Sequence, residues 1–139
     1  MEHIGRKFRN ISRISERDFN NKLAEYDLTH SQMDVLILLF RRKDLPVCQR
    51  DIEEGLGLKN PTVTGILNRL EAKGFIRRET LAGDRRCNRI VVTENAKELD
   101  KALLASIHAN DERMLRGFTE EESAFLADCL DRIIMNLSE

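Results

Sequence analysis

Residues 59–89 gather side chains that can bind phosphate oxygens and the edges of nucleic-acid bases. The segment carries eight basic residues against three acidic ones, a net charge of +5, although the whole chain has a net charge of −1. Lysine and arginine bind phosphates, and threonine and asparagine bond base edges. Residues 1–58 are neutral, and residues 90–139 have a net charge of −6. This distribution is typical of a protein that meets DNA with one face, although a solvated charge run without a partner would look the same.

A helix-turn-helix would hold the first half of this segment. Residues 49–56 predict a short helix that ends at Gly57. Asn60 is expected to be the N-cap of the next helix and Pro61 its first residue, since proline lacks only an amide that would be unpaired there. This second helix would enter the major groove of DNA with its N-terminal end first. Its expected buried stripe consists of Val63, Ile66, Leu67 and Leu70.

Polar residues on the exposed side of the second helix are the predicted DNA contacts. Thr62 and Thr64 each offer a hydroxyl and a methyl group, and Asn68 can bond adenine through two hydrogen bonds. Lys59 and Arg69 are placed for flanking phosphates. The alternative is an ordinary surface helix that begins with residues chosen for capping.

A hairpin would hold the second half of the segment. Residues 75–80 and 88–93 are rich in β-forming residues and flank a turn with a charged tip. Arg85 and Arg86 in this tip are expected to reach the minor groove, whose narrow A·T segments attract arginine. Asp84 either orients the tip by pairing with an arginine or simply forms the turn.

Helices surround this central part of the chain. Apolar residues at helical spacing predict helices at about residues 3–26, 31–42 and 94–117, and Thr119 begins a last one. Thr29, with Gln32 three residues later, predicts a capping box before the second of these helices, and Pro46-Val47-Cys48 is expected to form a short edge strand. The expected fold class is mainly α with a small β-hairpin (α+β). The apolar faces of the first helix and the last two helices exceed what one small lobe can cover, so we expect them to pack against a second copy.

Composition limits the remaining classes of protein. With 139 residues, 41% of them hydrophobic and 34% charged, the chain suits one helix-rich domain. It has no apolar run of ~20 residues and no secretory signal, so no membrane association and a cytoplasmic location are expected. The three cysteines suit reduced thiols. No phosphate loop, nucleophile elbow or zinc-protease motif is present, so neither an enzyme nor a cofactor is expected. A winged-helix module that binds protein instead of DNA is the competing interpretation.

Motifs along nearly the whole chain strongly resemble the MarR family of multiple-antibiotic-resistance-type regulators. They are Leu28-Thr29 with Gln32 and Leu36, Val63-Thr64 with Leu67, Leu70, Gly74 and Ile76, Asp84 with Arg86, and Val92-Thr93. Two residues depart from the family pattern. Gly65 stands where the family often has a larger or basic residue, which would reduce base contacts there, and Cys87 lies in the wing.

The resemblance implies one winged helix-turn-helix subunit of a homodimer. The DNA-binding lobe would span about residues 29–93, and the dimerisation helices about residues 3–26 and 94–138. It implies a sequence-specific transcriptional regulator, most often a repressor, released from a pseudo-palindromic operator by a small phenolic or lipophilic effector or by an oxidant. A dimer with two-fold symmetry should read half-sites about 10 bp apart.

Two other ways of sensing a signal are open at the sequence level. Cys87 follows Arg86 and precedes Arg89, an electropositive setting that favours the reactive thiolate. It is either a thiol switch or an incidental surface cysteine. His108 and Glu112 are four residues apart, but no Cys-x-x-Cys or His-x-x-x-His is present, so no metal site is expected.

Overall fold

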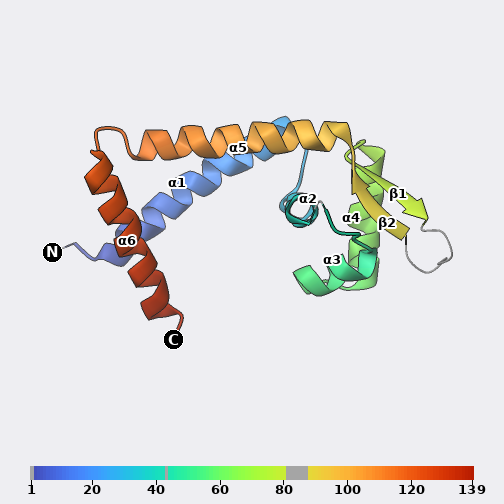
Figure 1. Cartoon of the computed structure of the whole chain (residues 1–139), viewed down its shortest axis with the longest axis horizontal. Coiled ribbons are helices and arrows are strands. Elements are labelled where there is room, and N and C mark those ends of the chain that lie inside the picture. Colours follow the sequence, from blue (N-terminus) through green and yellow to red (C-terminus); the bar gives the residue numbers. More distant parts are fainter. Residues whose placement is uncertain (1, 43, 81–87) are drawn as a thin grey trace. The chain divides into compact units, whose positions relative to one another are not determined.

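The computed structural model describes residues 2–42, 44–80 and 88–139. Within these ranges it has six helices and one two-stranded antiparallel sheet, so the predicted fold class is confirmed (Figure 1). The elements in chain order are α1 (Ile4–Glu25), α2 (His30–Arg41), α3 (Gln49–Leu56), α4 (Asn60–Ala72), β1 (Ile76–Thr80), β2 (Asn88–Val92), α5 (Glu94–Met114) and α6 (Glu120–Leu137).

The chain divides into two compact units, Met1–Glu98 and Leu99–Glu139. In the first unit α2, α3 and α4 pack on one another, and the hairpin packs against α4 through β1 (Figure 1). The β2 strand also contacts α2 and α3. This packing produces the helix-turn-helix with an adjacent hairpin that the sequence predicts.

The core of the first unit consists almost entirely of buried apolar side chains. The predicted stripe of α4 is confirmed, because Val63, Ile66, Leu67 and Leu70 are all buried. Other fully or almost fully buried side chains come from α2, α3 and both strands: Met33, Val35, Leu36, Leu39, Ile52, Ile76 and Ile90. Burial of each such side chain contributes roughly 1.5–3 kcal/mol to the stability of the fold. The buried stripe therefore holds the inner face of α4 against the core.

Two helix ends follow their predicted local signals. Thr29 and Gln32 form a complete capping box at the start of α2. Gly57 ends α3 in the left-handed conformation with φ 64°.

The predicted N-cap of α4 is wrong. Lys59 occupies the N-cap position, and Asn60 is the first helical residue, followed by Pro61. The Asn60 side chain instead donates from Nδ2 to Glu53 Oε2 of α3 at 3.2 Å. A bond to a carboxylate is stronger than one to a neutral group, which explains why Asn60 leaves the capping role.

The hairpin is regular over its described part. Its register pairs Ile76 with Val92 and Thr80 with Asn88 at the two ends. The extended segment predicted before α3 contributes a single bridge, Cys48 to Arg89, supported by a bond of 2.7 Å from Ile90 N to Val47 O. Pro46 has no amide, so it cannot donate to a longer ladder.

Helices α1, α5 and α6 keep much of their apolar surface uncovered. Leu23 is the buried residue of α1, and α6 has no buried residue. The large exposed side chains on these helices are Ile4, Ile11, Ile14, Phe19, Leu104, Ile107, Met114, Phe125, Leu126, Ile134, Met135 and Leu137. None of the helices in the described ranges has the length and hydropathy needed to cross a bilayer.

Candidate nucleic-acid interface

Two hydrogen bonds from one side chain join the helices of the helix-turn-helix. Gln49, at the start of α3, donates from Nε2 to Thr64 Oγ1 at 2.7 Å and to the carbonyl oxygen of Asn60 at 3.3 Å. The bonds fix the first turns of α4 against α3. Sequence reasoning missed Gln49 because its partners lie 11 and 15 residues away.

The outward face of α4 is polar and uncovered at most of the predicted positions. Lys59, Thr62, Asn68 and Arg69 are exposed, whereas Thr64 is half-buried beneath its bond to Gln49. Among the described residues, Lys59 and Arg69 have no ion-pair partner, so their charges are available to phosphate.

A small-residue line runs along the middle of this face. Pro61, Gly65, Asn68 and Ala72 are spaced four, three and four residues apart, so they lie above one another on the helix surface. A Cβ atom on Gly65 would meet nothing within 4 Å. Asn68 is therefore the residue of this line whose side chain can form hydrogen bonds, with Thr64 and Glu71 flanking the line.

Both arginines of β1 are paired with glutamates, so fewer unpaired positive charges are available to DNA than the net charge of +5 suggests. Arg77 pairs with Glu79 of its own strand at 3.4 Å. Arg78 reaches α4, where Nη1 donates to Asn68 Oδ1 at 2.9 Å and pairs with Glu71 Oε1 at 3.4 Å. Sequence reasoning did not single out Arg78, because its role depends on how the strand packs against the helix.

A polar network anchors the C-terminal end of α4. Lys73 Nζ donates to Gln32 Oε1 at 3.0 Å and also to the carbonyl oxygen of Asp27. Gln32 is buried, and its Oε1 also accepts from the amide of Thr29 at 3.2 Å. A buried polar group is stable only when it is hydrogen-bonded, so this lysine couples the end of α4 to the start of α2.

The tip of the hairpin lies outside the described residues. This applies to the predicted contacts Arg85 and Arg86, to the orienting residue Asp84 and to the redox candidate Cys87. The described stem ends at Thr80 and Asn88, whose side chains are bonded from Thr80 Oγ1 to Asn88 Oδ1 at 3.3 Å.

The cysteines correct one expectation from composition. Cys48 is disulfide-bonded, so the prediction of three reduced thiols is wrong. Its backbone amide donates to Asp51 Oδ2 at 2.8 Å, which places Cys48 at the N-cap of α3. Cys129 has a free thiol on α6 and is half-buried, which makes it a partial core residue at most.

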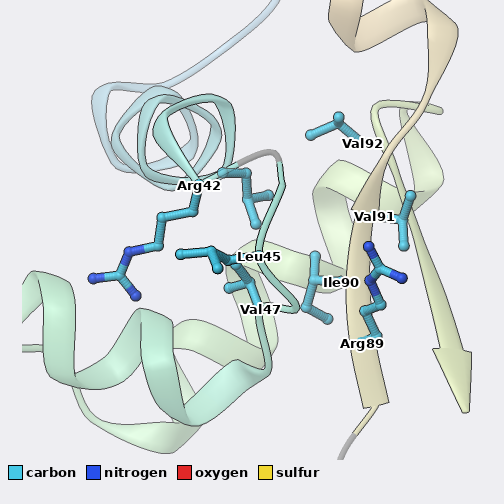
Figure 2. A pocket seen from close by; sticks show the side chains of 8 residues that line it. Arg42, Leu45, Val47, Arg89, Ile90, Val91 and Val92 are labelled. Carbon is cyan, nitrogen blue, oxygen red and sulfur yellow. The ribbon is translucent and has the colours of Figure 1, made fainter. Parts of the chain in front are cut away.

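A hollow opens between α2, the α2–α3 connection and β2 (Figure 2). It is lined by Leu39, Arg42, Leu45, Val47, Arg89, Ile90, Val91 and Val92, and its empty volume of about 310 Å³ includes open solvent. Most of that space is open to solvent, so the hollow is too small to enclose a drug-sized ligand. The guanidinium groups of Arg42 and Arg89 point away from each other (Figure 2), so they do not form one anion site.

Comparisons with known proteins agree with this geometry. The MarR family model matches residues 28–88. The HTH-type transcriptional regulator PecS of Dickeya dadantii is 30% identical over 129 residues, covering 91% of this chain and 77% of PecS. A crystal structure of Staphylococcus aureus MepR in complex with DNA has a TM-score of 0.82 and 28% identity, covering 94% of this chain and 96% of MepR.

A second MepR structure, bound to ethidium bromide, has a TM-score of 0.78 and 26% identity, covering 98% of this chain and 97% of MepR. The similarity to PecS and MepR extends across almost the full chain, well beyond the helix-turn-helix that the family model matches. The chain therefore belongs to the MarR family of transcriptional regulators.

Proposed function

We propose that the protein is a homodimeric, sequence-specific DNA-binding repressor that a small molecule releases from its operator. The observation that carries the proposal is the asymmetry of α4, whose inner face is fully buried while Thr62, Asn68 and Arg69 stand uncovered on the outer face. A helix held in this way can enter the major groove without disturbing the core. Similarity to MepR, which was solved in complex with DNA, supports the same assignment.

DNA contacts divide by chemistry. Lys59 and Arg69 bind phosphates, and Thr62 and Asn68 meet base edges. Thr64 contributes mainly through the bond that it accepts from Gln49. Arg85 and Arg86 at the hairpin tip hold the backbone or the minor groove, with Asp84 orienting them. A regulator of this kind acts where the chromosome lies, so we place it in the cytoplasm.

Dimerisation uses the uncovered apolar helices. The exposed side chains of α1, α5 and α6 include Ile11, Phe125, Ile134 and Leu137, and Leu137 is 82% exposed. Monomeric proteins rarely leave so many large apolar groups in water. We place the subunit interface on these helices, with the DNA-binding lobe formed by about residues 29–93.

Selection of bound duplexes from a random pool tests the proposal. The full-length protein should select a pseudo-palindrome whose half-sites are about 10 bp apart. Its affinity should fall by orders of magnitude over a few-fold rise in salt. Arg69→Ala should reduce the salt slope by about one per subunit, whereas the exposed α6 variant Arg132→Ala should leave it unchanged. If the wild-type protein retains no duplex even at low salt, the chain is a protein-interaction module instead.

The effector in this proposal is a small phenolic or lipophilic compound. MepR was solved with ethidium bromide, an aromatic cation, which supports small-molecule binding by this class of fold. A thermal-shift screen should find compounds that raise the unfolding temperature of the free protein and lower its affinity for the selected operator. A compound that stabilises the protein without affecting operator affinity is not the effector.

A thiol-based regulator is the second candidate, because Cys48 is disulfide-bonded at the N-cap of α3 and its backbone is bridged to Arg89. We propose that Cys87, two positions before Arg89 in the sequence, is the partner of Cys48 in this disulfide. Hydrogen peroxide would oxidise one thiolate to a sulfenic acid with uptake of a proton and release of water, and the second thiolate would displace hydroxide to form the disulfide. Reductant should then change the operator affinity of the wild-type protein and of Cys129→Ser, but not that of Cys48→Ser. Equal responses in all three proteins would rule out the switch.

A further inference from the structure

Arg78 and Asn68 form a contact between the wing and the exposed face of α4. Arg78 lies on β1 opposite Ile90, and its Nη1 donates to Asn68 Oδ1 at 2.9 Å. The same nitrogen pairs with Glu71 Oε1 at 3.4 Å. The Arg78 side chain is 24% exposed, so the strand and the helix enclose most of it. The arginine is therefore held by two side chains of α4, while Asn68 remains at the surface.

The chemistry of the pair fixes the orientation of the asparagine. A guanidinium group has five N–H donors and no acceptor, so it must face the oxygen of a neighbouring amide. With Oδ1 turned towards Arg78, the Nδ2 group of Asn68 points to the other side. A free surface asparagine can rotate its amide and present either a donor or an acceptor, whereas this one presents its donor.

The position of Asn68 makes this orientation relevant to DNA. Asn68 lies in line with Pro61, Gly65 and Ala72, and none of these three neighbours has a side chain that can form a hydrogen bond. In the major groove, guanine offers O6 and N7, adenine N7 and thymine O4 as acceptors, while the cytosine edge offers a donor. If the side-chain amide of Asn68 can present only its donor, it would favour bases that offer an acceptor at that position.

We propose that Arg78 is a specificity-determining positioning residue, which holds Asn68 as a hydrogen-bond donor towards one acceptor-bearing base in each half-site. The inference rests on the proposed DNA-binding function. It differs from a phosphate contact by Arg78, which would strengthen binding to all sequences alike. The pairing with Glu71 favours positioning, because it offsets the charge that a phosphate would require.

The test is selection of DNA from a random pool with the full-length wild-type protein and four variants. Arg78→Gln retains much of the side-chain length but can accept as well as donate, so it removes the orienting effect. Arg78→Lys can only donate and should restore it. Asn68→Ala removes the reader. Arg77→Ala is the matched control, because it deletes a neighbouring arginine that pairs within β1. Thermal unfolding confirms that each variant is folded.

We expect Asn68→Ala and Arg78→Gln to lose the preference at the same position of each half-site. Replacing that base pair in the operator should weaken wild-type binding by roughly three- to tenfold and Arg78→Gln binding by less than twofold. Arg78→Lys and Arg77→Ala should select the wild-type sequence. If Arg78→Gln also selects it, or weakens binding to all sequences equally with a smaller salt slope, the positioning role is wrong. A wild-type protein that selects no sequence refutes the proposed function itself.

Discussion

The side-chain amide of Gln49 lies 2.7 Å from the hydroxyl oxygen of Thr64 and donates to it across the helix-turn-helix. The bond connects the first residue of α3 with the buried edge of α4 and uses an acceptor site of the hydroxyl. Thr64 is consequently half-buried, in contrast to the exposed Thr62 two residues earlier. The sequence predicts that both threonines contact DNA, but Thr64 instead helps to hold the first turns of α4, on which Thr62 is exposed.

The main effect of removing this bond should be a loss of protein stability, with a smaller effect on DNA recognition. Gln49→Ala and Thr64→Val should each reduce the free energy of unfolding by about 1 kcal/mol, because one intramolecular hydrogen bond contributes roughly that amount. The double variant should lose less than the sum of the two, with a coupling energy of about 0.5–1.5 kcal/mol. Urea denaturation measures all three values. Additive losses would mean that the two side chains do not act together.

Gly65 offers a prediction in which stability and binding change in opposite directions. Gly65→Ala should stabilise the free protein by about 0.5–1 kcal/mol, since glycine weakens a helix interior and the new methyl group meets no atom within 4 Å. The same methyl group should weaken operator binding, because it stands in line with Asn68 on the outward face. Thermal unfolding and titration with the selected operator measure the two effects.

Gly55→Ala on α3 is the matched control. Its Cβ would lie 2.7 Å from Leu38 Cδ1, so the leucine must move and the stabilisation should fall short of that for Gly65→Ala. Equal stabilisation by the two substitutions would contradict this account of the packing.

The network at the end of α4 predicts an unequal effect of two lysines. Lys73→Met removes the bonds to buried Gln32 and to the Asp27 carbonyl, and should cost about 1–3 kcal/mol. Lys97→Met removes an exposed pair with Glu94 at 3.1 Å and should cost no more than about 0.5 kcal/mol. Urea denaturation of both variants decides the point, and similar losses would argue against a structural role for Lys73.

The proposed interface predicts a change of assembly from substitutions on α6. Leu126 and Leu137 are exposed and lie on the same side of the helix. Leu126→Glu/Leu137→Glu should give a monomer in analytical ultracentrifugation, because burying two carboxylates between subunits costs several kcal/mol. It should also bind the operator at least tenfold more weakly.

Met135→Glu is the control for this prediction. Met135 is also strongly exposed, but it lies two residues from Leu137 and so faces another side of α6. This variant should remain dimeric. Dimers formed by the double variant would place the interface elsewhere.

Sequence patterns predict those features that depend on residues three or four positions apart. The capping box of Thr29, the termination at Gly57 and the buried stripe of α4 are all local in this sense, and the structure confirms them. The Gln49–Thr64 and Arg78–Asn68 contacts join residues 15 and 10 positions apart, so they become visible only after the elements have packed. Asn60 shows the two levels in conflict, because a long-range bond to Glu53 displaces it from the cap that its local sequence favours.

The start of α4 has a thermodynamic consequence of its own. Thr29 and Thr119 cap their helices with their own hydroxyl groups, whereas Lys59 forms no side-chain cap for α4. A good cap stabilises a helix by about 1 kcal/mol, and a phosphate oxygen can take its place at a helix N-terminus. In the free protein the two bonds from Gln49 hold the first turn of α4 against α3, but the side chain of Lys59 caps none of its amide groups. A phosphate oxygen of the DNA backbone would supply that cap to a helix that is already in place.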